Sequence, residues 1–302
     1  MLCLPLRAFC VSVFVLAIVC LNIPISAQRD DDVISIDTSL VVLNASITDA
    51  AGKAAGGLKQ NLFRIFDDGV EQKIDSFGSE ETPFAAVILL DTSGSMEDRV
   101  TLARAAAIEF LGKLRSADSA AVYHFDSKVE SVQDFSNSRD IREHAFDLKS
   151  DGMTVLNDAV YKAAEALSKR PEKRRAIIVL SDGADTMSKT SDGKALKASL
   201  AANATIYTID MSPPDAKPGD QNRAVLKNFA EKTGGRYVST PGGTAMRDAF
   251  TRIVEELGSQ YTLSFQPTST MRDGKWHTLE LRVSRPKLTI RTRKGYNARK
   301  NK

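Results

Sequence analysis

The stretch Val87-Ile88-Leu89-Leu90-Asp91-Thr92-Ser93-Gly94-Ser95 is an apolar run that ends in an acid and hydroxyl groups. A short apolar run bounded by turn residues is typical of a strand buried on both faces, as in a parallel sheet. Open α/β sheets bind ligands beyond the carboxyl ends of such strands. Asp91, Ser93 and Ser95 could therefore supply oxygen ligands of the kind that Mg²⁺ and Mn²⁺ prefer. They could equally cap the helix that follows.

Two later stretches favour the metal site. Asp151 to Asp158 is a glycine-containing turn that includes Thr154, and it leads into a helical pattern. Ala176 to Gly183 is a second apolar strand, and it ends in Asp182. If the two apolar strands are parallel neighbours, these acids and hydroxyls meet at one edge of the sheet.

This ordered set of residues resembles the metal-ion-dependent adhesion site of von Willebrand factor type A domains. Asp91, Ser93 and Ser95 match its Asp-x-Ser-x-Ser motif, Thr154 matches its threonine loop and Asp182 matches the acid of its third loop. The resemblance implies that the hydroxyls ligate Mg²⁺ or Mn²⁺ and that the acids act directly or through water. It also implies that an Asp or Glu of a protein partner completes the coordination.

Asp158, four residues after Thr154, has two interpretations. It could support the metal ligands through hydrogen bonds from outside the coordination shell. It could instead be a first-turn acid that the helix dipole favours.

Strand and helix patterns alternate from Phe84 onward, which indicates a parallel sheet with helices between its strands. Helical spacing is expected over 156–168, 195–202, 224–232 and 244–257, and strand patterns recur at 119–125, 204–209 and 236–238. The predicted fold class is α/β: a doubly wound, mostly parallel six-stranded sheet of the von Willebrand A or Rossmann-like kind. This sheet is expected to be inserted into a small β-sandwich built from the N- and C-terminal flanks.

The two flanks are predicted to be all-β. Ile36 to Thr48 and Leu62 to Phe66 are strand patterns, Asp67-Asp68-Gly69 is a hairpin turn, and Gln72 to Phe77 is expected to return along the second strand. Asp67 and Asp68 are interpreted as turn residues. After residue 260 the alternation of apolar and polar residues resumes, and Trp276 is expected to pack in the core.

The predicted domain organisation follows from these patterns. Residues 1–27 are interpreted as a signal peptide, with Arg7 before an apolar stretch and a cleavage site after Ala27, although a retained anchor is the alternative. The other segments are 33–80 (N-terminal β segment), 84–258 (von Willebrand A domain), 259–297 (C-terminal β segment pairing with the N-terminal one) and 298–302 (basic tail). The three cysteines lie in the signal segment, so the mature chain would have no disulfide, thiolate zinc site or cysteine nucleophile.

Charge is nearly balanced overall, with 41 Lys and Arg against 38 Asp and Glu, but its distribution is uneven. From Arg282 onward there are nine Lys and Arg and no acid. One interpretation is contact with an anionic surface such as a membrane or a cell-wall polymer, whereas nucleic acid does not fit an exported chain. The alternative is a solvated edge strand whose charges prevent edge-to-edge pairing.

The function that these observations favour is an exported, divalent-metal-dependent protein-binding module for adhesion or for assembly of an envelope complex, in the periplasm or secreted. A metal-stabilised structural scaffold is the alternative, and a metal-dependent hydrolase fits less well. His124, His144 and His277 are not spaced as a metal-ligand pair, and neither a Gly-x-Ser-x-Gly elbow nor a phosphate-binding loop is present. We therefore expect no enzyme activity.

Overall fold

A computed structural model describes residues 40–79, 82–137, 153–212, 221–240, 243–267 and 274–298. The predicted signal peptide, the start of the threonine loop at Asp151 and all but one residue of the predicted basic tail lie outside these ranges. In the described part of the chain, no helix has the length and apolar character needed to cross a membrane.

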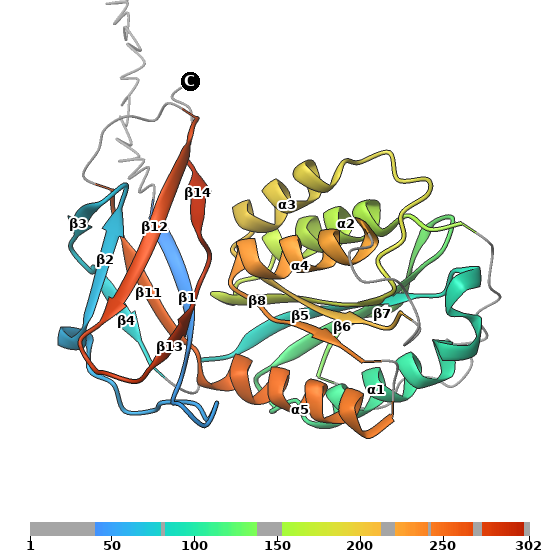
Figure 1. Cartoon of the computed structure of the whole chain (residues 1–302), viewed down its shortest axis with the longest axis horizontal. Helices are drawn as coiled ribbons and strands as arrows, with labels where there is room; N and C mark the ends of the chain where they lie inside the picture. Colours follow the sequence, from blue (N-terminus) through green and yellow to red (C-terminus); the bar gives the residue numbers. More distant parts are fainter. Residues whose placement is uncertain are drawn as a thin grey trace, which may run out of the picture. The chain divides into compact units, whose positions relative to one another are not determined.

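Six strands form the central sheet, with the strand of the opening motif in the middle (Figure 1). The strands are β5 (Phe84–Asp91), β6 (Ser119–Phe125), β7 (Val129–Ser136), β8 (Arg174–Ser181), β9 (Ala204–Asp210) and β10 (Tyr237–Ser239), and they lie in the order β10-β9-β8-β5-β6-β7. Only β7 runs antiparallel to its neighbour. The predicted six-stranded, mostly parallel sheet is thus confirmed.

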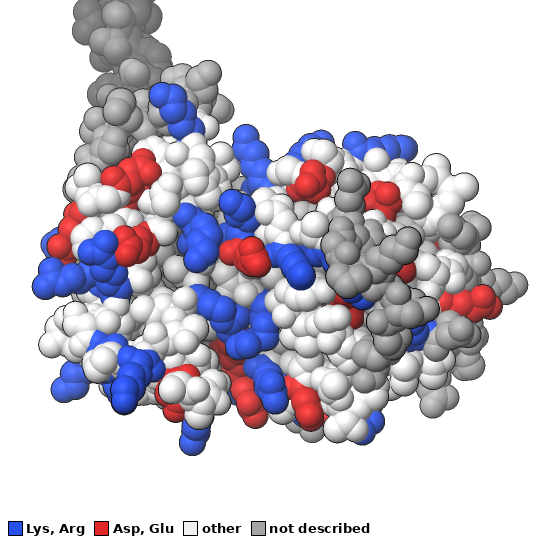
Figure 2. All heavy atoms as spheres, viewed as in Figure 1, with Lys and Arg blue, Asp and Glu red and all other residues white. Residues whose placement is uncertain are grey.

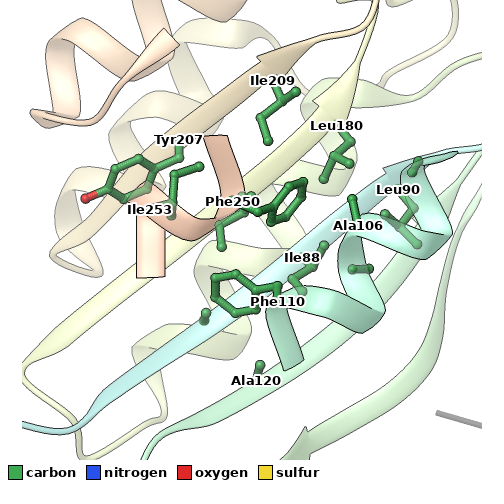
Figure 3. Close-up of a cluster of buried hydrophobic side chains, with 14 of the residues drawn as sticks. Ile88, Leu90, Ala106, Phe110, Ala120, Leu180, Tyr207, Ile209, Phe250 and Ile253 are labelled. Atoms are coloured by element: carbon green, nitrogen blue, oxygen red, sulfur yellow. The ribbon is translucent and has the colours of Figure 1, made fainter. Parts of the chain in front are cut away.

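Helices cover both faces of this sheet (Figure 1). α1 (Val100–Gly112) and α5 (Gly243–Ser259) cover one face, and α2 (Leu156–Ser168), α3 (Asp192–Ala201) and α4 (Gln221–Thr233) cover the other. Ile88 and Leu90 pack with Phe110 and Phe250 on the first face (Figure 3), whereas Val87 and Leu89 alternate with them and face the second. Because both faces of β5 are covered, every residue of the strand is buried and its sequence is a continuous apolar run up to Leu90.

The two flanks form a pair of four-stranded antiparallel sheets around one apolar core. One sheet has the order β13-β1-β11-β4 and the other β14-β12-β2-β3. Their strands are β1 (Val41–Thr48), β2 (Phe63–Asp67), β3 (Val70–Gln72), β4 (Ser76–Gly78), β11 (Tyr261–Phe265), β12 (Trp276–Val283), β13 (Thr289–Arg291) and β14 (Gly295–Asn297). Each sheet takes strands from both ends of the chain, which confirms the predicted insertion of the α/β part into a sandwich.

Three details of the flanks and the sheet edge differ from the sequence-based expectation. The single returning strand predicted from Gln72 to Phe77 is wrong: β3 ends at Gln72, and β4 pairs with β11 in the other sheet. Trp276 is 40% exposed at the start of β12 and is not a core residue. The edge strand β7 had not been predicted.

A buried carboxylate joins the sandwich to the α/β part. Glu256, near the end of α5, accepts hydrogen bonds from Ser46 Oγ of β1 at 2.8 Å and from Tyr207 Oη of β9 at 2.9 Å. It also pairs with Arg236 Nη2 at 3.1 Å and with the Arg291 guanidinium of β13. One side chain therefore connects a helix, the central sheet and two sandwich strands.

A buried arginine holds the end of the same helix. The fully buried guanidinium of Arg174, at the start of β8, donates to the carbonyls of Leu257 at 3.3 Å and Gly258 at 3.2 Å, and to the carbonyl of Gln260. It also donates to Thr262 Oγ1 of β11 at 3.1 Å. The carbonyls of Leu257 and Gly258 belong to the last turn of α5, where a positive charge is favourable.

Several basic residues of the C-terminal stretch make contacts within the molecule. Arg282 pairs with Glu280 at 2.6 Å, Arg291 pairs with Glu256, and Arg293 is buried and donates to Asn203 Oδ1 at 3.0 Å. Acidic side chains lie among the basic ones on the face shown in Figure 2. Contact with an anionic surface is therefore a prediction for the other basic residues of this stretch only.

Candidate metal centre

The predicted ligand Asp91 lies where β5 ends, next to the end of β8. The parallel register pairs Leu90 with Leu180, so Asp91 and Ser181 are adjacent at the carboxyl edge of the sheet. Ser181 Oγ donates to Asp91 Oδ2 at 2.5 Å. Ser93 donates to Asp91 Oδ1 from its Oγ at 2.5 Å and from its backbone N–H at 3.0 Å. The carboxylate is thus held in one orientation by two hydroxyls.

The two serines of the motif belong to the same hydrogen-bonded group. Ser93 Oγ lies 3.2 Å from Ser95 Oγ, and Ser95 is exposed at the start of the 3₁₀ segment Gly94–Arg99 that precedes α1. Ser93 occupies the cap position of this segment, but its side chain makes no capping hydrogen bond. Its hydroxyl is directed to Asp91 instead, so the helix-cap interpretation does not describe this residue.

Asp182 and the loop that follows it lie next to Asp91. Asp182 is half-buried directly after β8, and its Oδ1 accepts the N–H of Ala184 at 3.1 Å. Gly183 has a φ of +84°, and a Cβ there would lie 2.4 Å from the carbonyl oxygen of Asn222 in α4. Only glycine permits this sharp turn at the strand end.

The Thr154 loop is attached to the same segment. Thr154 is buried, and its carbonyl accepts the N–H groups of Thr186 at 2.9 Å and Met187 at 3.1 Å. Its own N–H donates to Thr186 Oγ1 at 2.9 Å. The structure thus brings Asp91, Ser93 and Ser95 together through side-chain hydrogen bonds, whereas Thr154 is placed by its main chain.

Asp158 and Asp185 hold the loop that follows Asp182 against α2 through hydrogen bonds. Asp158 accepts the N–H groups of Lys189 at 3.0 Å and Thr190 at 2.9 Å, and Asp185 accepts the N–H of Asn157 at 2.8 Å. Partial burial alone would raise the pKa of Asp158, but these hydrogen bonds hold it below its usual value. Asp158 therefore acts on the loop that carries Asp182, and Asp185 binds the first turn of α2.

Asp91 differs in its hydrogen-bond partners from Asp210, another buried acid at the same edge of the sheet. Asp91 and Asp210 are both 0% exposed at the ends of their strands. Asp210 pairs with Arg223 Nε at 3.1 Å and also accepts Tyr237 Oη at 2.5 Å. In the described part of the chain, the hydrogen bonds to Asp91 come from Ser93 and Ser181 and none comes from a basic side chain.

The pKa of the Asp91 carboxyl reflects its burial among uncharged hydrogen-bond donors. Burial, with a smaller contribution from the charge of Asp182, raises its pKa from 3.8 to about 6 against the lowering effect of the hydroxyl and amide donors. A buried anion is stable only when it is paired or coordinates a metal. A divalent cation fits this requirement, because the side chains that hydrogen-bond to Asp91 are hydroxyls, which offer oxygen.

The site is open to solvent on one side. Asp91, Ser93 and Thr154 are buried, whereas Ser95 is exposed and Asp182 is half-buried. Hydroxyl and carboxylate oxygens that line an open edge of this kind could hold a hard cation and leave part of its coordination accessible.

Two residues of this edge had not been predicted from the sequence. Ser181 immediately precedes Asp182, and its position at the strand end next to Asp91 is the signal that could have identified it. Asp210 ends β9 in the same way as Asp91 ends β5, after a continuous buried run. Its partner Arg223 lies in the next helix, α4, and no spacing pattern in the sequence identifies the pair.

Comparisons with known proteins give a family match for part of the chain. Residues 86–184 match the model of the von Willebrand factor type A domain, an interval that contains all five predicted ligands. No curated protein matches the chain.

Solved structures with a similar fold come from several organisms. They include a mutant of the PilB minor pilin from Streptococcus sanguinis (14% identity, TM-score 0.48), of which this chain spans 62% while the match covers 59% of this chain. BatB from Bacteroides thetaiotaomicron (17% identity, TM-score 0.47) is matched over 100% of its length and 58% of this chain. A von Willebrand factor type A protein from Catenulispora acidiphila (14% identity, TM-score 0.48) is matched over 71% of its length and 82% of this chain.

Proposed function

We propose that this chain, whose residues 86–184 match the model of the von Willebrand factor type A domain, is an exported, divalent-metal-dependent protein-binding module that serves adhesion or assembly of an envelope complex. Asp91, Ser93, Ser95, Thr154 and Asp182 would hold a Mg²⁺ or Mn²⁺. When bound, the ion supplies a coordination position for an Asp or Glu side chain of a protein partner.

The observation that carries this proposal is the buried Asp91 carboxylate, which has hydroxyl donors and no basic partner among the described residues. The hydroxyls of Ser93 and Ser181 fix its orientation, and the loop braced by Asp158 fixes the positions of Asp182 and Thr154. The exposed Ser95 favours a binding site over a closed structural site, because a partner can reach this side of the group.

The surroundings of the site support binding instead of hydrolysis. A metal-dependent hydrolase needs a base positioned to act on the attacking water. His124 Nδ1 lies 3.3 Å from Thr92 Oγ1, and its Nε2 lies 3.5 Å from Glu130 Oε2. His277 lies in the sandwich next to Asp67. Neither of these histidines is hydrogen-bonded to Asp91, Ser93 or Ser95.

Replacing Thr154 with alanine should weaken Mg²⁺ binding by at least about 10-fold. Loss of a residue that only hydrogen-bonds to a metal ligand already lowers metal affinity by that factor. The sheet should stay folded, because the loop is held through the main chain of Thr154. Isothermal titration of Mg²⁺ and Mn²⁺ into the chelator-treated protein measures the affinity. Thr289→Ala, at an exposed threonine of β13, is the matched control and should bind as the wild type does.

Equal affinity of the Thr154→Ala and Thr289→Ala variants would contradict the assignment of Thr154. Absence of saturable binding in the wild type would contradict the metal-dependent function. If the cation binds, selection of acidic peptides in Mg²⁺ and their release by chelator tests the partner chemistry. Peptides that stay bound in chelator would show a different docking mode.

A further inference from the structure

A second group of possible metal ligands lies in the sandwich, away from the strand-end site. Asp67 ends β2, Asp68 follows it in the turn to β3, and His277 lies in β12. β12 pairs with β2 in the register Leu279 to Asp67, and the N–H of Asp68 donates to the carbonyl of Thr278 at 2.9 Å. The strand pairing thus fixes the imidazole beside two consecutive carboxylates.

Three potential ligand atoms converge in this group. His277 Nδ1 lies 3.3 Å from Asp67 Oδ1 and 3.1 Å from Asp68 Oδ2. One ligand atom from each residue can be chosen so that all three lie within 4.8 Å of one another. Ligand atoms around a tetrahedral Zn²⁺ with bonds of about 2.0–2.1 Å are roughly 3.3 Å apart. The two separations between His277 Nδ1 and the carboxylate oxygens match this geometry.

The other oxygen of each carboxylate is already occupied. Asp67 Oδ2 accepts Tyr296 Oη at 2.9 Å, and Asp68 Oδ1 accepts the backbone N–H of Thr278 at 2.8 Å. The ring of Tyr296, opposite His277 in β14, also lies 5.3 Å from the imidazole centroid. Outer hydrogen bonds and packing of this kind orient the first ligands of metal sites.

A simple ion pair accounts less well for this arrangement. Imidazole Nδ1 carries at most one hydrogen, yet two carboxylate oxygens face it at similar distances. A cation bound between the three atoms would interact with all of them. Asp68 is exposed, Asp67 is buried and His277 is half-buried, so water can complete the coordination from one side.

We propose that Asp67, Asp68 and His277 form a second divalent-cation site, of the transition-metal type, that links the N-terminal and C-terminal flanks. The imidazole favours Zn²⁺ over the purely oxygen-seeking Mg²⁺. Asp67 and His277 are 210 residues apart in sequence, so the ion would connect the two ends of the sandwich. The sequence alone favoured a turn role for Asp67 and Asp68, because the pairing that brings His277 to them is long-range.

Zinc titration into the chelator-treated Asp91→Asn protein tests this site without interference from the strand-end ligands. We expect saturable binding of one equivalent and a raised Tm. Adding the Asp68→Asn substitution to the Asp91→Asn protein should weaken zinc binding by at least about 10-fold. Asparagine tolerates the φ of +46° at this position, so this variant should keep the turn.

His277→Gln should also lose the binding, whereas His124→Gln, the control in β6, should retain it. Binding of Co²⁺ in place of Zn²⁺ gives an absorption spectrum as a second readout. The proposal is overturned if the Asp91→Asn protein binds no zinc, or if Asp68→Asn and His277→Gln bind zinc as tightly as His124→Gln does. Both outcomes are independent of Mg²⁺ binding at the strand-end site.

Discussion

Replacing Glu256 with alanine should lower the free energy of unfolding by about 3–5 kcal/mol, as expected when one partner of a buried ion pair is removed. The carboxylate is 7% exposed and accepts hydrogen bonds from Ser46 and Tyr207 in addition to its pairs with Arg236 and Arg291. Alanine would leave these donors, two of them charged, without their acceptor. Urea-induced unfolding measures the change.

Glu255 provides the matched control, because it is the neighbouring glutamate of α5 and is exposed. Glu255→Ala should change the free energy of unfolding by less than about 0.5 kcal/mol, as is usual for surface substitutions. If both variants had the same stability, Glu256 would not hold the sandwich to the α/β part. Two separate unfolding transitions in Glu256→Ala alone would support the connecting role directly.

Replacing Asp91 with asparagine should stabilise the metal-free protein at pH 7 by up to about 3 kcal/mol, since one pKa unit corresponds to about 1.4 kcal/mol. The pKa of Asp91 is raised from 3.8 to about 6 by burial in the folded state. Between these values the folded state binds more protons than the unfolded state, so the stability contributed by the protonated acid is lost as pH rises from about 4 to about 6. Asparagine carries no charge, so the Asp91→Asn protein does not lose this stability as pH rises.

The measurement is the free energy of unfolding of both proteins in chelator across pH 4 to 7, because the difference between them removes the contribution of other acids. Mg²⁺ should then stabilise the wild type at pH 7 and not Asp91→Asn. Asp210→Asn is the control: it separates Arg223 from its carboxylate and should destabilise the protein. A less stable Asp91→Asn protein in chelator at pH 7 would refute this electrostatic account.

The sequence predicted the central sheet well because its strands are buried on both faces. The runs that precede Asp91 and Ser181, Phe84–Leu90 and Ala176–Leu180, are apolar, and such runs are recognisable without knowledge of their neighbours. α2 was predicted with its observed bounds, since its apolar positions follow a clear helical period. The strand-end acids were then placed by the rule that parallel strands end at one edge.

The sheet edges and the long-range pairs were harder to predict. β7 pairs with β6 through two register irregularities, and its apolar residues Val129, Val132 and Phe135 are spaced by three, so strict alternation is lost. β3 and β4 have three residues each, too few to show a period. The Arg223 and His277 contacts depend on tertiary pairing that no local pattern records.

The position of β1 between β11 and β13 also sets an order of events during synthesis. Asn44 of β1 and Thr262 of β11 are 218 residues apart, so at 5–20 residues per second β1 waits roughly 10–40 s for its neighbour. The α/β segment is complete before that, whereas β1 is made before it and has both strand partners only afterwards, and β2 has only β3 beside it until β12 is made. Until then the unpaired edges of β1 and one edge of β2 are open to other chains, which makes these strands a site of aggregation in the incomplete chain.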